Sequence, residues 1–425
     1  MNIFKNIKGT IDLFNKDIYN IENLIKIFKN NFILYGYNAI KTPSIENINI
    51  IKKIKNNINL PFIYKIKKNK FLIFDLTIPL IRFCLTNNNK IIFPFKRYQI
   101  QKVWRGEKPQ NNRYREFYQC DVDIISFKSY LEEIEIILLC DKIFNNINLP
   151  IIFFINHKDI LYGLCEYYKI PKKQWLFFIN TIDKIDKLSK NIIIEILKKK
   201  INKIIIDNIF NFFKKKKKNI NFLFFLKKKF KNNKYGKKGI NYLLKIFKII
   251  NKINLNNIKV IFKINLSRGL NYYSKTIFEI KYKNDNISLG GGGRYDNLLK
   301  INNKIINGIG ISFGLYRIYN IIKKLNIKIK NKRKKKLIFL NFGKENFFII
   351  NKYASYLRNK NIIIEIFPYK EKIKKQIKYA IFNKYNFLII IGKKEIKKKI
   401  FKIKNLKKKK EIIFKKIKEL INYIK

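Results

Sequence analysis

Residues whose types and spacing could do chemistry gather in one stretch, Lys96–Asp123, with the sequence KRYQIQKVWRGEKPQNNRYREFYQCDVD. The pattern predicts two strands, roughly Tyr98–Glu107 and Arg115–Asp123, joined by a loop at Lys108–Asn112 with a proline and paired asparagines. Alternate side chains of a strand share a face. One face of this hairpin should therefore gather a guanidinium, an amide, an aromatic ring and several acids: Arg105, Glu107, Phe117, Gln119, Asp121 and Asp123.

The arginines of this hairpin are informative because arginine is scarce in a chain this rich in lysine. A planar, permanently charged guanidinium suits two-point contacts with phosphate or carboxylate, whereas lysine offers a point charge on a flexible stem. The alternative is a charged hairpin lying over a sheet, because ion-pair networks are also common structural features. Residue chemistry alone leaves both interpretations open.

Another candidate stretch is Phe71–Pro79, FLIFDLTIP, which predicts a buried strand. Asp75 and Thr77 would share a face of that strand and could accept hydrogen bonds from an ammonium group. The simpler interpretation is a strand that ends beside a turn at Pro79.

Two glycine-containing stretches near residue 300 also carry candidate groups. Leu289–Asp296, LGGGGRYD, would let a backbone approach a ligand closely, although a glycine run is often only a flexible loop. Gly308–Arg317, GIGISFGLYR, predicts a strand that ends at Gly314 and a helix that starts at Arg317. An arginine there could hold a phosphate chain, or could make only a solvent-exposed ion pair.

The elements that must position these groups follow from periodicity. Ile18, Ile21, Ile25, Phe28 and Phe32 predict a helix with one apolar stripe, which Gly36 ends before a strand at Tyr37–Thr42. A helix at Glu132–Asn145 and a strand at Leu149–Ile155 follow. Residues 172–257 have helical periodicity and a charge run at Lys214–Lys218, for which a partly disordered basic segment is the alternative.

The clearest boundary is the basic stretch Asn326–Lys336, NIKIKNKRKKK. After it, strands and helices alternate: strand Leu337–Phe342, helix near Phe347–Asn359, strand Ile362–Phe367, helix near Glu371–Asn383 and strand Phe387–Ile391. This alternation predicts a layered α/β domain with parallel strands.

Bulk composition limits the class of protein. A chain of 425 residues that is 47% hydrophobic is expected to form two or three domains with real cores. The net charge of +66 indicates attraction to nucleic acid or another polyanion. Much of that charge could instead be compositional, because Lys, Asn and Ile dominate the whole chain.

Four cysteines without a CxxC pair or zinc-ligand spacing predict reduced, mostly buried thiols and a cytoplasmic protein. The single histidine, His157, follows an apolar strand and is expected in a surface loop; on its own it supports neither a histidine-based metal site nor a Ser-His-Asp triad. No signal peptide is evident, and no apolar run approaches the roughly 18 residues needed to span a bilayer, so no membrane partner is expected.

These motifs together carry a resemblance. VWRGEKP followed by NRYREFYQCDVD resembles motif 2 of class II aminoacyl-tRNA synthetases, and RYREFYQCDVD is similar to histidyl-tRNA synthetases in particular. DLT-x-P, the stretch Arg268–Tyr273 (RGLNYY), GGGRYD and the motif 3-like GIGISFGLYR resemble the same family and occur in the same order. One departure is Asn271, where the family has Asp, which leaves any charge role of that position in doubt.

The resemblance implies an α+β fold: a class II synthetase catalytic domain, with an antiparallel sheet flanked by helices, and a C-terminal layered α/β anticodon-binding domain. The implied parts are the catalytic domain in two pieces, 1–171 and 258–325, a helical insertion at 172–257, a basic linker at 326–336 and the anticodon-binding domain at 337–425. A homodimer is also implied.

The implied reaction is ATP-dependent ligation of L-histidine to tRNA(His) through histidyl-adenylate. The family roles would make Arg105 and Arg268 catalytic, with ATP held by Arg105, Glu107, Arg113, Phe117 and Arg317. Histidine would contact Asp75, Thr77, Gln119, Asp123, Arg268, Tyr272 and Tyr273. Gln110 and Arg113 would meet the tRNA acceptor end. The chemistry requires Mg²⁺, for which the sequence identifies no protein ligands.

Three alternatives remain at this level. The chain could be a catalytically inactive paralogue, the regulatory subunit of an ATP phosphoribosyltransferase, which would usually lack the C-terminal domain and drift in the arginine motifs. Both the domain and the motifs are present here, which argues against this alternative. It could be an RNA-binding or sensor module on the same fold. It could also be a class II synthetase of another specificity, such as threonine or proline, but the paired tyrosines Tyr272 and Tyr273 favour histidine.

Overall fold

A computed structural model gives the arrangement of the chain and describes residues 4–54, 62–110, 112–126, 129–186, 188–213, 219–267, 273–285, 287–296, 299–301, 304–327, 335–360, 362–368 and 370–424. The chain divides into two compact units, Met1–Ile329 and Lys330–Lys425, and the division falls inside the stretch expected to be a linker. Among the described residues, none of the helices is both long and apolar enough to cross a bilayer.

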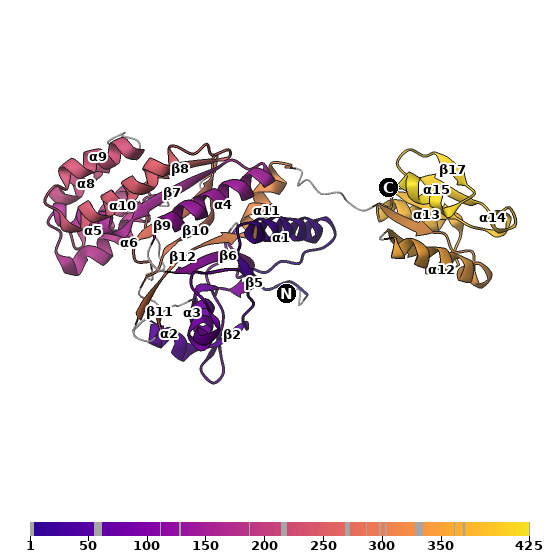
Figure 1. Ribbon diagram of the computed structural model, residues 1–425, viewed down its shortest axis with the longest axis horizontal. Helices are drawn as coiled ribbons and strands as arrows, with labels where there is room; N and C mark the ends of the chain where they lie inside the picture. The colour runs from indigo at the N-terminus through magenta and orange to yellow at the C-terminus, as the bar shows by residue number, and fades with distance from the viewer. Residues whose placement is uncertain are drawn as a thin grey trace. The chain divides into compact units, whose positions relative to one another are not determined.

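A nine-stranded sheet forms the centre of the first unit (Figure 1). Neighbouring strands are antiparallel except for the parallel pairs β1–β5 and β7–β8. The order across the sheet is β1 (Asn38–Ala39), β5 (Phe95–Trp104), β6 (Glu116–Ser126), β12 (Lys304–Gly314), β10 (Ser288–Arg294), β9 (Thr276–Tyr282), β7 (Ile151–His157) and β8 (Ile258–Phe262), with β11 (Leu299–Ile301) paired to β12. The expected antiparallel-rich sheet is confirmed.

One face of this sheet is apolar and packs on helices. Three helices bury their apolar sides against β5, β6 and β12 in one continuous core: α1 (Lys16–Leu34), α4 (Leu131–Ile147) and α11 (Leu315–Lys324). Figure 1 shows them along one side of the sheet. The stripe predicted for α1 holds at Ile21, Phe28 and Phe32, but Ile18 is 44% exposed, because the buried positions begin one turn later.

The opposite face of β5 and β6 is partly covered by α3 (Thr77–Thr86) and by a small sheet of β2 (Ile45–Asn47), β4 (Lys70–Leu72) and β3 (Lys65–Ile66), next to α2 (Ile48–Ile54). The strand predicted at Phe71–Pro79 is therefore wrong, because β4 ends at Leu72 and a helix begins at Thr77. The Asp75 carboxylate accepts a hydrogen bond from the Ile78 N–H at 3.2 Å, which satisfies a donor of the first helical turn. An apolar run of this length cannot be assigned to strand or helix by periodicity alone.

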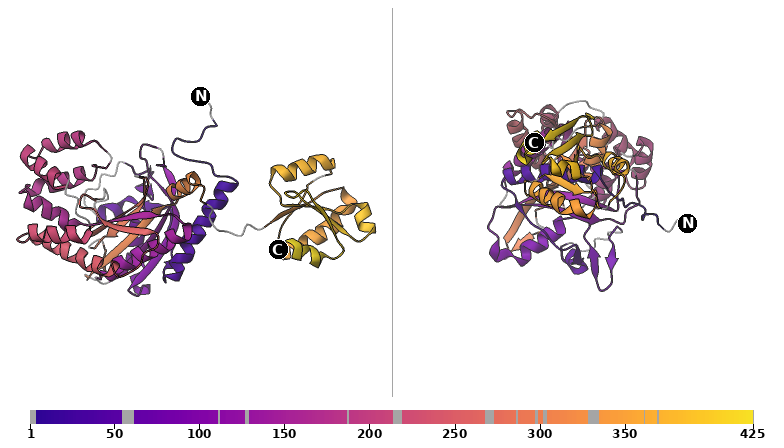
Figure 2. Two further views of the ribbon diagram at one scale, coloured as in Figure 1. Left: turned by 90° about the horizontal axis from the view of Figure 1, so that it is seen from above. Right: turned by 90° about the vertical axis from the view of Figure 1, so that its right-hand side faces the viewer.

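The helices α5 (Lys158–Tyr167), α6 (Trp175–Ile182), α7 (Lys190–Lys198), α8 (Lys203–Phe213), α9 (Asn219–Lys229) and α10 (Lys234–Ile250) gather beside the sheet at the end away from α1 (Figures 1 and 2). Helices α6–α10 occupy the stretch expected to be a helical insertion. They share one apolar core with the sheet, so a separate insertion domain at 172–257 stays a prediction. Lys214–Lys218 lie outside the described residues.

Burial contradicts the expectation for the single histidine and confirms the expectation for the cysteines. His157 is 2% exposed, so the expected surface loop is wrong: β7 runs through His157, whose Nδ1 accepts the Asp159 N–H at 3.2 Å and caps α5. The expectation of reduced, buried thiols is confirmed, because all four cysteines are buried and free.

The second unit is a layered α/β domain, as the alternation predicted. Its sheet has the order β14 (Ile363–Ile366), β13 (Lys336–Phe339), β15 (Phe387–Ile390), β16 (Phe401–Asn405), β17 (Glu411–Phe414), with β13 parallel to both neighbours. Leu337 and Phe339 face a core with α12 (Lys344–Asn359) and α15 (Ile417–Ile424), whereas Ile338 faces a core with α13 (Ile373–Phe382). A short helix, α14 (Lys393–Lys397), follows β15.

Close packing of α5 on α10 generates a testable prediction. A Cβ at Gly163 would lie 2.6 Å from the Gly236 Cα, so Gly163→Ala must push the two helices apart. We expect a loss of about 1–3 kcal/mol of stability. Urea unfolding followed by tryptophan fluorescence measures it, because both tryptophans lie in the first unit. The control is Gly314→Ala, whose Cβ would meet no atom of the described residues closer than 3.6 Å. Equal stabilities for the two variants would contradict the packing argument.

Candidate active site

The sheet face opposite α1, α4 and α11 carries a ladder of buried polar side chains. Cross-strand pairing places Arg97 opposite Asp123, and Gln99 opposite Asp121. Asp121 in turn lies opposite Ser312 of β12. Because alternate residues share a face, these side chains lie together on the side not taken by the apolar core.

An open cleft with an empty volume of about 630 Å³ lies at the end of this ladder. Six residues expected at an ATP or amino-acid site line it: Arg105, Glu107, Arg113, Phe117, Gln119 and Arg317. The other lining residues come from the loop before β6 and from β10, β12 and α11: Asn112, Tyr114, Ser288, Leu289, Gly290, Gly291, Ser312, Phe313, Gly314 and Tyr316. Gly290 and Gly291 belong to the glycine run, which forms strand β10 rather than a loop.

Not every expected site residue lies in this cleft. Asp75, Thr77, Gln110, Asp123 and Tyr273 are not among its lining residues. Arg268 and Tyr272 lie outside the described residues. Asn112, Ser312 and Tyr316 line the cleft without having been predicted, since their positions depend on how β12 and α11 pack beside the hairpin.

Arg105 lies at the point where the hairpin leaves the sheet. The predicted first strand is too long at its end, because β5 stops at Trp104 and the Gly106 N–H bonds to the Phe62 carbonyl at 2.7 Å. The Arg105 guanidinium donates to the Phe74 carbonyl at 2.9 Å and to Gln119 Oε1 at 3.2 Å. Its central carbon lies 5.2 Å from the centre of the Phe117 ring. These contacts hold a permanent cation at the cleft.

Two more guanidinium groups reach the same cleft. Arg113 Nε donates to a Glu107 carboxylate oxygen at 2.6 Å. Burial acts to raise the pKa of Glu107, but Arg113 and the nearby Arg105 and Arg317 outweigh it, so the pKa is lowered. Arg317, in the first turn of α11, donates to the backbone carbonyls of Asn112 at 3.0 Å and Ser288 at 2.9 Å. Three arginines from two distant parts of the chain therefore converge on one cleft.

Asp123 is buried below the cleft and is held from two sides. Its Oδ2 lies 2.6 Å from Arg97 Nη2, and its Oδ1 accepts the Tyr295 hydroxyl at 2.5 Å. Burial raises the pKa of Asp123, although Arg97 and the Tyr295 hydroxyl oppose the rise. The carboxylate fits because its β12 neighbour is Gly310, where a Cβ would lie 2.0 Å from Oδ1.

Two other buried acids each have an oxygen without a hydrogen-bond partner. Asp75 Oδ2 and Asp121 Oδ1 make no hydrogen bond within the described part of the structure. Burial raises the pKa of Asp75 to about 6, against the opposing effects of the Ile78 N–H, Arg105 and Arg97. Burial also raises the pKa of Asp121. A buried acceptor left unpaired costs about 1–3 kcal/mol, so this arrangement is suited to a ligand that donates hydrogen bonds.

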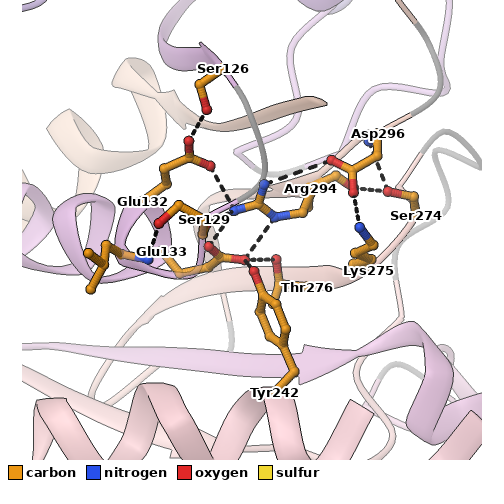
Figure 3. Close-up of polar contacts among 11 residues, drawn as sticks. Ser126, Ser129, Glu132, Glu133, Tyr242, Ser274, Lys275, Thr276, Arg294 and Asp296 are labelled. Carbon is orange, nitrogen blue, oxygen red and sulfur yellow. Dashed lines mark hydrogen bonds and ion pairs between the residues drawn. The ribbon is translucent and has the colours of Figure 1, made fainter. Parts of the chain in front are cut away.

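Arg294, from the GGGRYD stretch, is a structural residue and not a lining residue of the cleft. Its buried guanidinium bonds to Glu133 at 2.5 Å, to Glu132 at 2.8 Å and to the Ser129 carbonyl at 2.6 Å (Figure 3). The Tyr242 hydroxyl of α10 donates to the same Glu133 at 2.9 Å. This network joins β10 to α4 and α10, and it fixes the strand end from which Tyr295 reaches Asp123.

The described residues do not fit a metal ion held by the protein alone. Within residues 4–424, apart from the gaps given above, no three His, Cys, Asp or Glu side chains converge as a metal site requires. Glu107, the one acid among the described residues that line the cleft, is bonded to Arg113.

The chain matches a family model described as histidyl-tRNA synthetase over residues 9–318, and a model of the anticodon binding domain over residues 336–425. The histidine–tRNA ligase of Azobacteroides pseudotrichonymphae is 37% identical over 435 residues, which cover 94% of this chain and 93% of that protein. These matches disfavour the regulatory-subunit alternative, because a ligase is matched over 93% of its length.

Solved structures agree on the fold. The histidyl-tRNA synthetase of a Nostoc species has a TM-score of 0.83 at 24% identity, with 99% of this chain and 98% of that chain covered. A Bacillus halodurans protein described as an ATP phosphoribosyltransferase regulatory subunit/histidyl-tRNA synthetase has a TM-score of 0.75 at 17% identity, with 92% and 98% covered. At these identities the likeness concerns the fold, whereas the family model and the full-length relative decide the family. This chain belongs to the histidyl-tRNA synthetase family.

Proposed function

We propose that the chain ligates L-histidine to tRNA(His) in two steps. The histidine carboxylate attacks the α-phosphorus of ATP, which forms histidyl-adenylate and releases pyrophosphate. A hydroxyl of the 3′-terminal ribose of tRNA then takes the histidyl group and releases AMP. The observation that carries this proposal is the convergence of Arg105, Arg113 and Arg317 on a cleft beside buried acids with unpaired oxygens.

The arginines are suited to the first step because two anions must approach each other. A carboxylate reaches an α-phosphate only if fixed positive charge offsets their repulsion, and preorganised cations do this without reorganising at the moment of reaction. Arg105 would hold the α-phosphate, and Arg113 and Arg317 the departing pyrophosphate. The Arg113 side chain is 42% exposed, which leaves it room to exchange Glu107 for phosphate oxygens.

The remaining cleft residues suit the adenosine and the tRNA end. Phe117 would stack on the adenine. The neighbouring arginines lower the pKa of Glu107, and its carboxylate would accept a hydrogen bond from the adenine amino group. Gln110 and Arg113, whose backbones are joined by a hydrogen bond from the Arg113 N–H to the Gln110 carbonyl at 2.9 Å, would meet the acceptor end of tRNA. Mg²⁺ would enter bound to the ATP phosphates, since it is commonly held by substrate phosphates and few protein groups.

The buried acids are suited to histidine. The unpaired Oδ2 of Asp75 would accept a hydrogen bond from the α-ammonium group of histidine. Thr77 and Gln119 would help to hold the same group. A neutral imidazole has one donor and one acceptor nitrogen. The Asp123 carboxylate would accept a hydrogen bond from the imidazole N–H, and the Tyr273 hydroxyl would donate one to the other ring nitrogen. Arg268 would contact the histidine carboxylate and the α-phosphate, and Tyr272 would line the histidine pocket. Both residues lie outside the described part of the structure.

Other features support the proposed partners. The net charge of +66 and the anticodon binding domain fit tRNA as a polyanionic partner. A homodimer would cover large apolar side chains that are exposed near the N-terminus and on α1: Phe4, Ile7, Phe14, Ile33 and Leu34. Four free thiols fit a cytoplasmic location.

Asp123→Ala tests the amino-acid assignment. Loss of the buried acceptor should lower kcat/KM for histidine at least about 100-fold, because the imidazole donor would be buried unpaired. Histidine-dependent ATP–pyrophosphate exchange measures this. The control is Asp17→Ala, which also removes a carboxylate bonded to a tyrosine, Tyr319, but at the contact of α1 with α11. Exchange that survives unchanged in Asp123→Ala would rule out the assignment.

Asp75→Asn tests how much burial of the Asp75 carboxyl lowers the free energy of unfolding. The pKa of Asp75 is about 6 in the folded chain against an ordinary 3.8, so the stability it contributes is full below pH about 4 and is lost as the pH rises through 6. Without ligand, the asparagine variant should gain about 2–3 kcal/mol at pH 8 and nothing near pH 4. Urea unfolding by tryptophan fluorescence at both pH values checks it; a pH-independent difference would contradict the argument.

A further inference from the structure

Arg97 is a fully buried guanidinium on β5 that does not line the cleft. Its Nη2 lies 2.6 Å from Asp123 Oδ2 and also donates to the Leu76 carbonyl at 3.1 Å. Its Nη1 reaches Gln99 Oε1 at 3.4 Å, and its Nε has no hydrogen-bond partner among the described residues. A buried ion pair that is only partly satisfied is weak evidence for a stabilising role.

The two partners of Arg97 Nη2 belong to the two ends of the proposed histidine site. Leu76 lies between Asp75 and Thr77, the residues proposed to hold the α-ammonium group. Asp123 is the residue proposed to accept the imidazole donor. One nitrogen therefore joins the start of α3 to strand β6, across the site where the amino acid would lie.

The charge of Arg97 also matters to all three buried acids. Asp75, Asp121 and Asp123 lie on or beside the same sheet face, and Arg97 is among the charges that oppose the rise of each pKa. Arg105, another described guanidinium, also acts to lower the pKa of Asp75, but it lines the cleft, where ATP would take up its charge. Arg97 is fully buried and does not line the cleft, so its charge would continue to act on the three acids when ATP binds.

We propose that Arg97 is a positioning residue of the amino-acid pocket: its guanidinium sets the separation between the Asp75–Thr77 segment and Asp123, and balances the carboxylates that receive histidine. This inference rests on the proposed function of those residues. Arg97 itself contacts neither substrate. It acts on histidine through Leu76 and Asp123, so its loss should affect histidine and leave ATP almost unaffected.

Arg97→Lys is the sharpest test, because it keeps the positive charge and removes the fork. A single ammonium at the end of a flexible stem does not reproduce the planar geometry that holds Leu76 and Asp123 together. We expect the KM for histidine in ATP–pyrophosphate exchange to rise at least about tenfold, while the KM for ATP changes less than about twofold.

The matched control is Arg82→Lys, on the same helix α3 that Arg97 contacts. Arg82 Nε bonds both oxygens of the largely buried Glu46, at 2.7 and 2.9 Å, so this variant also removes a guanidinium–carboxylate contact that holds α3. It should change neither KM. An equal rise in the KM for histidine in Arg82→Lys would mean that loosening α3 suffices, which would overturn the specific role of Arg97.

A second variant covers the case in which Arg97→Lys does not fold. In Arg97→Gln/Asp121→Asn one buried charge of each sign is removed, so the excess of acids is unchanged while the link between Leu76 and Asp123 is lost. We expect the same selective rise in the KM for histidine. In either variant, an unchanged KM for histidine, or a parallel rise in both KM values, would overturn the inference.

Asp123→Ala, measured in the same assay, separates this inference from the proposed function. If Asp123→Ala abolishes exchange and Arg97→Lys behaves as the unmodified chain, only the positioning role fails. If Asp123→Ala leaves exchange intact, the histidine assignment itself fails, and with it the basis of the inference.

Discussion

The candidate active site depends on three carboxylates, those of Asp75, Asp121 and Asp123, that are buried against one sheet face. Ionised acids in such a place repel each other and lose hydration, so they persist only where cations and hydrogen-bond donors offset the cost. Arg97 and the Tyr295 hydroxyl do so for Asp123, while Asp75 and Asp121 each keep one oxygen unpaired. Buried carboxylate oxygens without partners are costly, and the hydrogen-bond donors of histidine, its α-ammonium group and imidazole N–H, would lower that cost.

The two faces of the sheet carry different side chains, which makes this burial possible. Strands β5, β6 and β12 turn one set of side chains into the helix-covered core, whereas the alternate set contains the polar ladder, with the apolar Val103 and Ile125 at its ends. Glycine at position 310 leaves the volume that the Asp123 carboxylate occupies, and the Arg294 network anchors the strand end that presents Tyr295. Core packing and site geometry therefore come from the same strands, and a one-residue slip in register would destroy both.

Much of this could be predicted from the sequence, for physical reasons that also explain the failures. Alternation in the hairpin placed Asp121 and Asp123 on one face, because the two-residue period of a strand is local information. The sequence predicts a strand where α3 begins, because an apolar run does not distinguish a strand from a helix and does not reveal the Ile78 N–H bond to Asp75. The role of Arg97 was not foreseen, because its partner Leu76 lies on a separate segment whose approach only the folded chain shows.

A crystal structure of the full chain with bound L-histidine would test the central claim most directly. The account predicts the α-ammonium group within hydrogen-bond distance of Asp75 Oδ2 and the imidazole donor on Asp123, with Arg97 still bridging Leu76 and Asp123. Histidine bound elsewhere, or bound in the cleft with the Asp75 and Asp123 carboxylates out of reach, would contradict it.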